Sequence, residues 1–204
     1  MKQSVPYDIC FRHERDEVFA LETERLRLAV LKKGAAQKVC DYYVKNRAFH
    51  KKWAQTQPDS YFTPRVQKDY IKNDLSLFYD DRLLPLFIFE KDDPTKVIGR
   101  ISLFNIVRGG MMSGVVGYHQ DEEHCGKGYM LEALTALSYF SFKELKLHRI
   151  EAYIIPHNER SLKLIRRAGF REEGLRKSFM HINGKWEDHL GFALFEENLK
   201  EIKK

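Results

Sequence analysis

A change in hydrophobic period near the middle of the chain constrains the fold more than any other feature of this sequence. Three apolar runs, 84–89, 97–107 and 114–119, alternate in the manner of β-strands and are separated by short turn segments. From Gly128 onward the apolar residues recur instead at the spacing of one helix face. We therefore predict an antiparallel three-strand meander that leads directly into an α-helix.

Patterns on either side of this region extend the prediction to the whole chain. The Asn183-Gly184 dipeptide suits a two-residue hairpin turn, because both positions tolerate positive φ. We predict the order β-α-α-β-β-β-α-β-α-β-β, a mixed α/β sheet, with its remaining elements at 25–31 (strand), about 35–48 and 64–79 (helices), 149–155 (strand), about 159–168 (helix), and 174–182 and 185–195 (strands). Residues 21–204 are expected to form one domain. Residues 1–20 are expected to be an N-terminal arm that packs on the surface or swaps to a partner.

Composition excludes several classes of protein. The chain has 204 residues, of which 43% are hydrophobic, so it can bury a core and is not expected to be disordered. Its formal net charge of +6 favours acidic partners, such as a phosphorylated cofactor or nucleic acid, without establishing either. The three cysteines, Cys10, Cys40 and Cys125, have no C-x-x-C spacing, so we predict neither a disulfide framework nor a metal site. A reducing cytoplasm is the simplest compartment, and no apolar run is long enough to predict a membrane span.

The segment 121–129 carries the most chemical information. Gly126 and Gly128 stand just before the predicted helix, where unpaired backbone N–H groups and the positive end of the helix dipole can bind an anion. Lys127 adds a formal charge to this turn. The alternative is a helix-start turn that binds no ligand, since glycine-rich turns are common.

Two common phosphate-binding loops fail at specific positions. A P-loop requires Ser or Thr directly after its Gly-Lys pair, whereas here Gly126-Lys127 is followed by Gly128 and then Tyr129. A dinucleotide fingerprint requires a third glycine where this chain has Leu131, and the strands before it are predicted to be antiparallel rather than βαβ.

Residues Glu123 to Gly128 resemble the [QR]xxGx[GA] pyrophosphate loop of GNAT-superfamily N-acetyltransferases. Asn158-Glu159-Arg160-Ser161 followed by Gly169-Phe170 resembles the second half of that fold, and residues 21–28 resemble its first strand. The likeness extends over about residues 21–195 and is greatest to the ribosomal-protein-alanine N-acetyltransferases. The departure is Glu123, where the superfamily usually has Gln or Arg. The resemblance implies a single GNAT-type α/β (α+β) domain: a mixed, mostly antiparallel central sheet, helices on both faces and a splayed parallel strand pair.

The resemblance also implies acetyl-CoA as the co-substrate. The pyrophosphate is then expected on the backbone amides of Cys125, Gly126, Lys127, Gly128 and Tyr129. The pantetheine arm is expected to pair, like an added strand, with backbone groups of Tyr118, His119 and Gln120. An N–H near Tyr118 or His119 would face the thioester oxygen as negative charge develops there.

Catalytic roles follow from the same resemblance. Ser161 is the candidate proton donor to the thiolate, and Asn158 is expected to cap its helix and bind the pantetheine; plain helix capping is the alternative for both residues. Several relatives carry Glu where this chain has Val115, so no base is evident, although His119, Glu187 and Asp188 are candidates. An α-amine has a pKa near 7.7–8.0, against about 10.4 for a lysine side chain, so an N-terminus needs only a weak base.

Three further features carry predictions of their own. Phe49 and Trp53, with Lys51 and Lys52 between them, are expected to form a wall of the acceptor groove, although a lone Trp is more often a core residue. The Cys125 thiol could have a lowered pKa beside the helix amides, but a small loop residue is the simpler interpretation. A basic cluster could bind the 3′-phosphate of CoA or ribosomal RNA, or be a solvated face; its members are Lys163, Arg166, Arg167 and Arg171.

We therefore predict an enzyme that moves an acetyl group from acetyl-CoA to a primary amine by direct attack in a ternary complex. The expected acceptor is the N-terminal α-amine of a protein, with a ribosomal protein as the leading candidate. The alternatives are a small-molecule acceptor, such as a polyamine, amino sugar or amino acid, or an acetyl-CoA-binding module without turnover. We expect a cytoplasmic monomer or homodimer, with the ribosome as a candidate partner and with neither membrane nor direct nucleic-acid binding.

Overall fold

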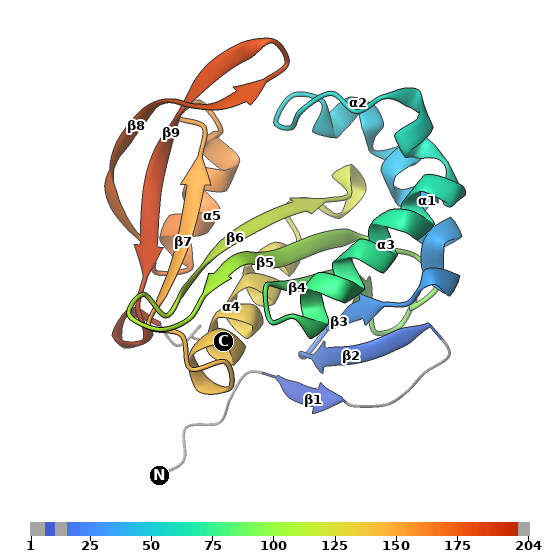
Figure 1. Ribbon diagram of the computed structural model, residues 1–204, viewed down its shortest axis with the longest axis horizontal. Helices are drawn as coiled ribbons and strands as arrows, with labels where there is room; N and C mark the ends of the chain where they lie inside the picture. The colour runs from blue at the N-terminus through green and yellow to red at the C-terminus, as the bar shows by residue number, and fades with distance from the viewer. Residues whose placement is uncertain (1–6, 11–15, 200–204) are drawn as a thin grey trace.

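Residues 7–10 and 16–199, which this computed structural model describes, form one mixed sheet of nine strands (Figure 1). Every neighbouring pair is antiparallel except β6 and β7, and the spatial order is β1-β2-β3-β4-β5-β6-β7-β9-β8. The strands are β1 (Asp8–Cys10), β2 (Glu17–Glu22), β3 (Leu26–Leu31), β4 (Leu83–Glu90), β5 (Gly99–Val107), β6 (Ser113–Gln120), β7 (Arg149–Ile154), β8 (Arg171–Ile182) and β9 (Lys185–Leu194). The mixed, mostly antiparallel sheet predicted from the sequence is confirmed.

Helices cover both faces of the sheet, as predicted. On one face α1 (Ala36–Lys45) and α3 (Pro64–Tyr79) pack over a core that includes Phe87. On the other face α4 (Tyr129–Lys143) and α5 (Glu159–Arg167) pack over a core that includes Ile101. Figure 1 shows α3 in front of the sheet and α4 behind it. No helix in the described ranges is both long and apolar enough to cross a bilayer.

The structure departs from the predicted order at two places. The helix expected over about 35–48 is divided into α1 and the short α2 (Arg47–His50) at Asn46. The Asn46 side chain turns away to donate to Asp121 Oδ2 (3.1 Å) and to accept the Glu122 N–H (3.0 Å), so a tertiary contact ends α1 there. Described residues of the expected N-terminal arm form β1 and part of β2 in the sheet, whereas residues 1–6 and 11–15 lie outside the described residues.

The parallel pair determines where a ligand can bind. β6 and β7 share a register only over 113–115 and 149–151, after which their paired residues end. β7 remains paired with β9 from Ile150 to Ile154, and β6 remains paired with β5. The two strands therefore diverge like the arms of a V, which Figure 1 shows beside α5. The splayed pair expected from the resemblance is present.

Candidate functional site

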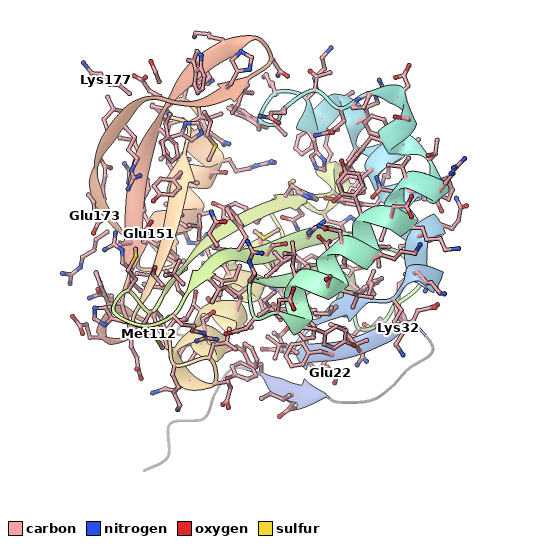
Figure 2. The ribbon with its side chains drawn as sticks, in the orientation of Figure 1. Glu22, Lys32, Met112, Glu151, Glu173 and Lys177 are labelled. Carbon is pink, nitrogen blue, oxygen red and sulfur yellow. The ribbon has the colours of Figure 1, made fainter. Side chains whose placement is uncertain are left out.

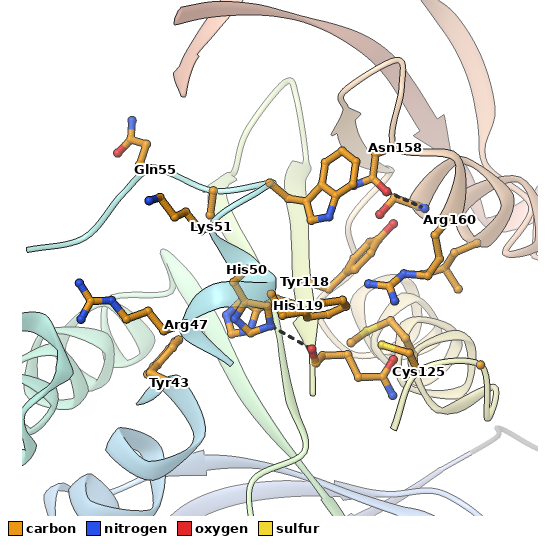
Figure 3. A pocket seen from close by; sticks show the side chains of 18 of the residues that line it. Tyr43, Arg47, His50, Lys51, Gln55, Tyr118, His119, Cys125, Asn158 and Arg160 are labelled. Carbon is orange, nitrogen blue, oxygen red and sulfur yellow. Dashed lines mark hydrogen bonds between the residues drawn. The ribbon is translucent and has the colours of Figure 1, made fainter. Parts of the chain in front are cut away.

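A cavity of about 490 Å³ lies where β6 and β7 diverge. Ten of the residues singled out from the sequence for cofactor binding, acceptor binding or catalysis line it: Phe49, Trp53, Tyr118, His119, Gln120, Cys125, Gly126, Gly128, Asn158 and Ser161. Two others, Lys127 and Tyr129, belong to the same loop but do not line the cavity. Folding thus brings together residues that are more than a hundred positions apart in the chain. Figure 3 shows this cavity from close by.

The loop at one end of the cavity is held by a buried carboxylate. Asp121 accepts hydrogen bonds from Lys45 Nζ (2.9 Å), the Asn46 amide (3.1 Å) and the Glu123 N–H (2.9 Å), and it contacts His124 Nδ1 at 3.1 Å. Burial raises the pKa of this carboxyl, but these hydrogen bonds outweigh burial and lower the pKa to about 2. Asp121 is therefore ionised at neutral pH, and it fixes the turn that leads out of β6.

Both loop glycines adopt a conformation that other residues avoid. Gly126 and Gly128 each have φ of +82°, in the left-handed region. A Cβ at Gly126 would meet nothing within 4 Å, so the backbone conformation, rather than lack of space, requires glycine there. Gly128 is the N-cap of α4, which leaves the first amides of that helix without helical partners.

The free amides of the loop begin one residue later than predicted. Cys125 donates its N–H to the Glu122 carbonyl (3.2 Å), so that amide is already used. From Gly126 to Tyr129, no backbone N–H has an acceptor among the described residues. These amides, at the positive end of the α4 dipole, can bind an anion such as a diphosphate.

A bracing contact behind this loop was not predicted from the sequence. Arg25 donates Nη1 to the Lys127 carbonyl (3.0 Å) and Nε to Glu132 Oε2 (2.7 Å), and its guanidinium lies 4.6 Å from the Tyr129 ring centre. Glu123, the departure from the family pattern, pairs with Lys45 at 2.7 Å. Both interactions cross between elements far apart in the chain, so no local spacing signals them.

The free edge of β6 presents particular backbone groups to the cavity. Asp121 donates its N–H toward β5, to the Ile98 carbonyl (2.9 Å). The backbone N–H and C=O groups of successive residues in an antiparallel strand point to opposite neighbours. The backbone groups of His119 therefore also face β5, and those of Tyr118 and Gln120 face the side of β7. Of the three residues expected to pair with pantetheine through the backbone, only Tyr118 and Gln120 thus point the right way.

The Tyr118 hydroxyl is buried and has no hydrogen-bond partner among the described residues. Burial raises its pKa to about 12, although the nearby Ser161 side chain opposes that shift. Asn158 caps α5 by accepting the Ser161 N–H at 3.2 Å, which confirms the predicted capping. The Tyr118 and Ser161 side chains thus lie together on the α5 wall of the cavity, where Figure 3 shows Tyr118 beside Asn158 and Arg160.

Two histidines gather on the opposite wall, and only His119 was singled out from the sequence. His119 Nδ1 lies 2.7 Å from the Tyr42 hydroxyl, and the His50 ring is centred 5.0 Å from the His119 ring. His50 Nε2 lies 2.9 Å from the Gln120 carbonyl oxygen, which can only accept, so Nε2 carries the proton and Nδ1 is unprotonated. Burial lowers the pKa of both histidines, so both are neutral at pH 7.

The other base candidates lie outside the cavity. Glu187 pairs with Lys185 (3.2 Å), and Asp188 accepts the Ser178 N–H (2.7 Å). Val115, the position at which the resemblance implies a Glu, has Glu151 as its partner on β7.

Glu151 does not supply the missing base. It is bound by Arg149 at 2.6 Å and by the Tyr153 hydroxyl, and it does not line the cavity. Figure 2 shows Glu151 together with Glu173, which also pairs with Arg149, on the β7–β8 side of the molecule.

Aromatic side chains form most of the remaining wall, beyond β6. Phe49 lies 5.0 Å from the Arg160 guanidinium, and the Trp53 ring is centred 5.6 Å from the His157 ring. Neither is a core residue, so the alternative interpretation of Trp53 as core is wrong. Tyr43, Tyr61 and Phe62 also line this part of the cavity.

A hydrogen-bonded bridge joins the two sides of the cleft above the cavity. Asn183, at the tip of the β8–β9 hairpin, accepts from the Thr56 N–H (3.0 Å) and hydroxyl (2.6 Å). Its Nδ2 donates to the Lys51 carbonyl (2.7 Å), and Gln55 donates to the His181 carbonyl (3.0 Å). Figure 1 shows the hairpin tip reaching the segment after α2. We call these four hydrogen bonds the latch.

The remaining predictions concern the Cys125 thiol, the basic cluster and metal binding. Burial raises the pKa of the Cys125 thiol, so the loop does not activate it. Of the basic cluster, Lys163 and Arg167 line the cavity, whereas Arg166 pairs with Glu172 (3.0 Å) outside it. Within residues 7–10 and 16–199, no His, Cys, Asp or Glu residues group in a way that could hold a metal ion.

The chain matches known proteins over most of its length. A profile of the acetyltransferase (GNAT) domain matches residues 25–171. The chain is 38% identical to the "Probable N-acetyltransferase YjcK" of Bacillus subtilis over 149 residues, which are 73% of this chain and 82% of that protein. It is 33% identical to the ribosomal protein uS5-alanine N-acetyltransferase of Escherichia coli over 174 residues, which are 85% of this chain and 89% of the relative.

A solved structure agrees with the fold. Mycobacterium smegmatis RimJ in complex with CoA-disulfide superposes with a TM-score of 0.81 at 26% identity. The match covers 86% of this chain and 84% of that one.

Proposed function

Because this chain belongs to the GNAT acetyltransferase family, we propose that it acetylates the N-terminal α-amine of a protein, with a ribosomal protein as the leading acceptor. The observation that carries the proposal is the cavity between the diverging strands. It joins a glycine loop with free amides, at one end, to an aromatic wall that can receive an amine, at the other. Acetyl-CoA is the co-substrate of this family, and a relative of this chain binds CoA.

The residues at the loop end fit acetyl-CoA. The free amides from Gly126 to Tyr129 suit its diphosphate, and Lys163 and Arg167 add positive charge on the same wall. The backbone groups of Tyr118 and Gln120 suit the amides of its pantetheine arm, although His50 already occupies one lone pair of the Gln120 carbonyl. The co-substrate supplies an activated acetyl thioester.

Two groups of the protein would act on the acyl centre. The Tyr118 N–H faces the cavity and would stabilise negative charge on the thioester oxygen. The Ser161 hydroxyl would give a proton to the departing thiolate. The buried Tyr118 hydroxyl, with no partner among the described residues, lies beside Ser161 and can donate to it as that proton leaves.

His50 is the best-placed base for the acceptor ammonium. Its Nδ1 is unprotonated because Nε2 donates to the Gln120 carbonyl, and its side chain lines the cavity next to the free edge of β6. The lowered pKa keeps it neutral at pH 7, so it can accept a proton without first losing one. His119 is less suited, since its Nδ1 is engaged by Tyr42.

The charges around the cavity favour an α-amine over a polyamine. Of the described residues that line the cavity, none carries a carboxylate and five carry cationic side chains: Arg47, Lys51, Arg160, Lys163 and Arg167. Such surroundings lower the pKa of a bound ammonium, which helps an α-amine to lose its proton, and they repel an acceptor that carries several positive charges. The latch also closes one side of the cleft, which favours a chain end over a lysine in the middle of a chain.

The proposal is tested by free-thiol release from acetyl-CoA with a peptide that begins with Ala. The expected result is one acetyl group on the α-amine, located by tandem mass spectrometry. The same peptide with its N-terminus blocked, and spermidine, serve as controls and are expected to release no thiol above the background. Thiol release with spermidine alone would favour the small-molecule alternative. CoA binding without turnover on any amine would favour the binding module.

A further inference from the structure

We propose that the acceptor carries an acidic side chain within its first four residues, and that Lys51, assisted by Arg47, selects it. This inference rests on the proposed N-terminal acetylation and names a class of substrate within it. The two cations stand on the acceptor side of the cavity, near Tyr43, whereas Cys125 and Arg160 stand on the other side (Figure 3).

The cationic lining forms two groups. Arg160, Lys163 and Arg167 belong to α5 and flank the glycine loop, where a diphosphate would neutralise them. Arg47 and Lys51 come from α2 and its C-cap, on the acceptor side. A diphosphate held at residues 126–129 would lie beside the first group, which leaves the second group available to another source of negative charge. A carboxylate on the acceptor is the simplest such source.

Lys51 is free to pair with it. No carboxylate lies within ion-pair distance of Lys51 Nζ among the described residues, although several other surface lysines have such a partner. Its backbone is fixed, because the Lys51 carbonyl accepts the latch hydrogen bond from Asn183 at 2.7 Å. A cation on an anchored backbone, with no internal partner, can bind an incoming carboxylate at little cost in lost internal contacts.

Arg47 is held more tightly and plays the smaller part. It pairs with Asp59 at 2.5 Å and lies 4.3 Å from the Phe62 ring centre. Asp59 is almost fully exposed, so this pair is screened, and the Arg47 Nε and Nη1 groups have no acceptor among the described residues. Arg47 therefore contributes positive electrostatic potential at the acceptor end, and Lys51 contributes the direct contact with the acceptor carboxylate.

The position of the acid follows from the spacing of anchored residues. His50, which touches the Gln120 carbonyl on β6, is next to Lys51 in the chain, so the reacting end of the acceptor lies close to this cation. An extended peptide advances about 3.4 Å per residue. A lysine side chain spans about two such steps. The carboxylate is thus expected on residue two, three or four, and not farther along.

The experiment compares three peptides that begin with Ala and differ only at residues two to four. One peptide carries Glu at these positions, the second carries Gln and the third carries Lys. For the wild-type protein at low salt, we expect kcat/KM to fall from Glu to Gln to Lys, with about tenfold between the ends of the series. We expect the difference to lie in KM rather than kcat, and to shrink as salt is added.

Charge reversal identifies the residue responsible. Lys51→Glu should invert the order, so that the Lys peptide becomes the better substrate. Lys68→Glu makes the same change of net charge on the exposed face of α3, outside the cavity, and should leave the wild-type order unchanged. Equal kcat/KM for all three peptides, or equal effects of the two variants, overturns this inference while the proposed function stands. No acetylation of any peptide overturns the proposed function itself, and this inference with it.

Discussion

The loop end of the cleft and its acceptor end are built in different ways. At the loop end, the groups available to a ligand are backbone amides and two left-handed glycines, within nine consecutive residues from Asp121 to Tyr129. At the acceptor end, the available groups are side chains, and they come from α1, α2, the segment after α2 and the tip of the β8–β9 hairpin. One end is nearly continuous in the chain and the other is assembled from distant parts.

The difference predicts which changes each end tolerates. A backbone site is sensitive to substitutions that alter φ or block the amides, and it tolerates most other changes of side chain. Glu123 is an example, because it departs from the family pattern and its side chain pairs with Lys45. A side-chain site can change specificity by single substitutions without loss of the fold. We therefore expect cofactor binding to be lost abruptly, and acceptor preference to be changed gradually.

The largest expected effect is that of Gly126→Asp. An aspartate there must adopt φ near +82°, and it brings a carboxylate to the seat of the diphosphate. We expect the Kd for acetyl-CoA to rise by about 100-fold or more, measured by isothermal titration calorimetry. Gly109→Asp is the matched control, because Gly109 also has positive φ (+72°) and open surroundings but lies in the β5–β6 turn. Equal affinity in the two variants would remove the loop from cofactor binding.

His50→Gln tests the acceptor end. Without the unprotonated Nδ1, kcat at pH 7 is expected to fall by about 100-fold while the Kd for acetyl-CoA stays the same. In the wild-type protein, kcat should fall as the pH drops through the pKa of His50, which burial places below its usual value near 6.5, because the protonated ring cannot act as a base. The variant should lose this acid limb.

The control for this experiment is His148→Gln, an exposed position outside the cavity that should leave both kcat and the pH profile unchanged. A His50→Gln variant that retains the wild-type acid limb would show that another group takes the proton.

Ser161→Ala is expected to slow turnover less, by about tenfold, with little change in cofactor affinity. The leaving thiolate is already a modest base, so it gains less from a proton donor than an alkoxide would. Single-turnover measurement with saturating acetyl-CoA gives the rate of the chemical step. Asn158 caps α5 through the Ser161 backbone N–H, which alanine keeps, so the helix should be undisturbed. An unchanged rate would exclude Ser161 from the reaction.

The smallest effect is expected from the latch. Asn183→Gly keeps the positive φ of the turn (+50° for Asn183) and removes the three hydrogen bonds of the Asn183 side chain. We expect KM for the peptide acceptor to rise about threefold to fivefold while the Kd for acetyl-CoA stays constant. Asn183→Asp retains the oxygen that accepts from Thr56 and should lie between. Equal changes in both constants would mean that the two ends are coupled.

Local patterns were enough to predict most of the fold. The alternating runs from 84 to 119 and the helical spacing after Gly128 gave β4, β5, β6 and α4, because hydrophobic period reports secondary structure directly. β1 and β2 were missed, since β2 joins the sheet by pairing with β3, and the short β1 joins it by pairing with β2. The break at Asn46 was missed for a similar reason, because it depends on a contact with Asp121.

The sequence by itself determined the backbone half of the site. The glycines at 126 and 128 and the cap at Asn158 are local requirements of φ and of helix ends, which any chain must meet with a few residue types. Only the tertiary structure decided the rest. It brought His50 to the Gln120 carbonyl, turned the His119 backbone away from the cavity and left the Lys51 ammonium group without an ion-pair partner in the described part of the chain. Those facts depend on which elements meet in space, and no spacing along the chain encodes them.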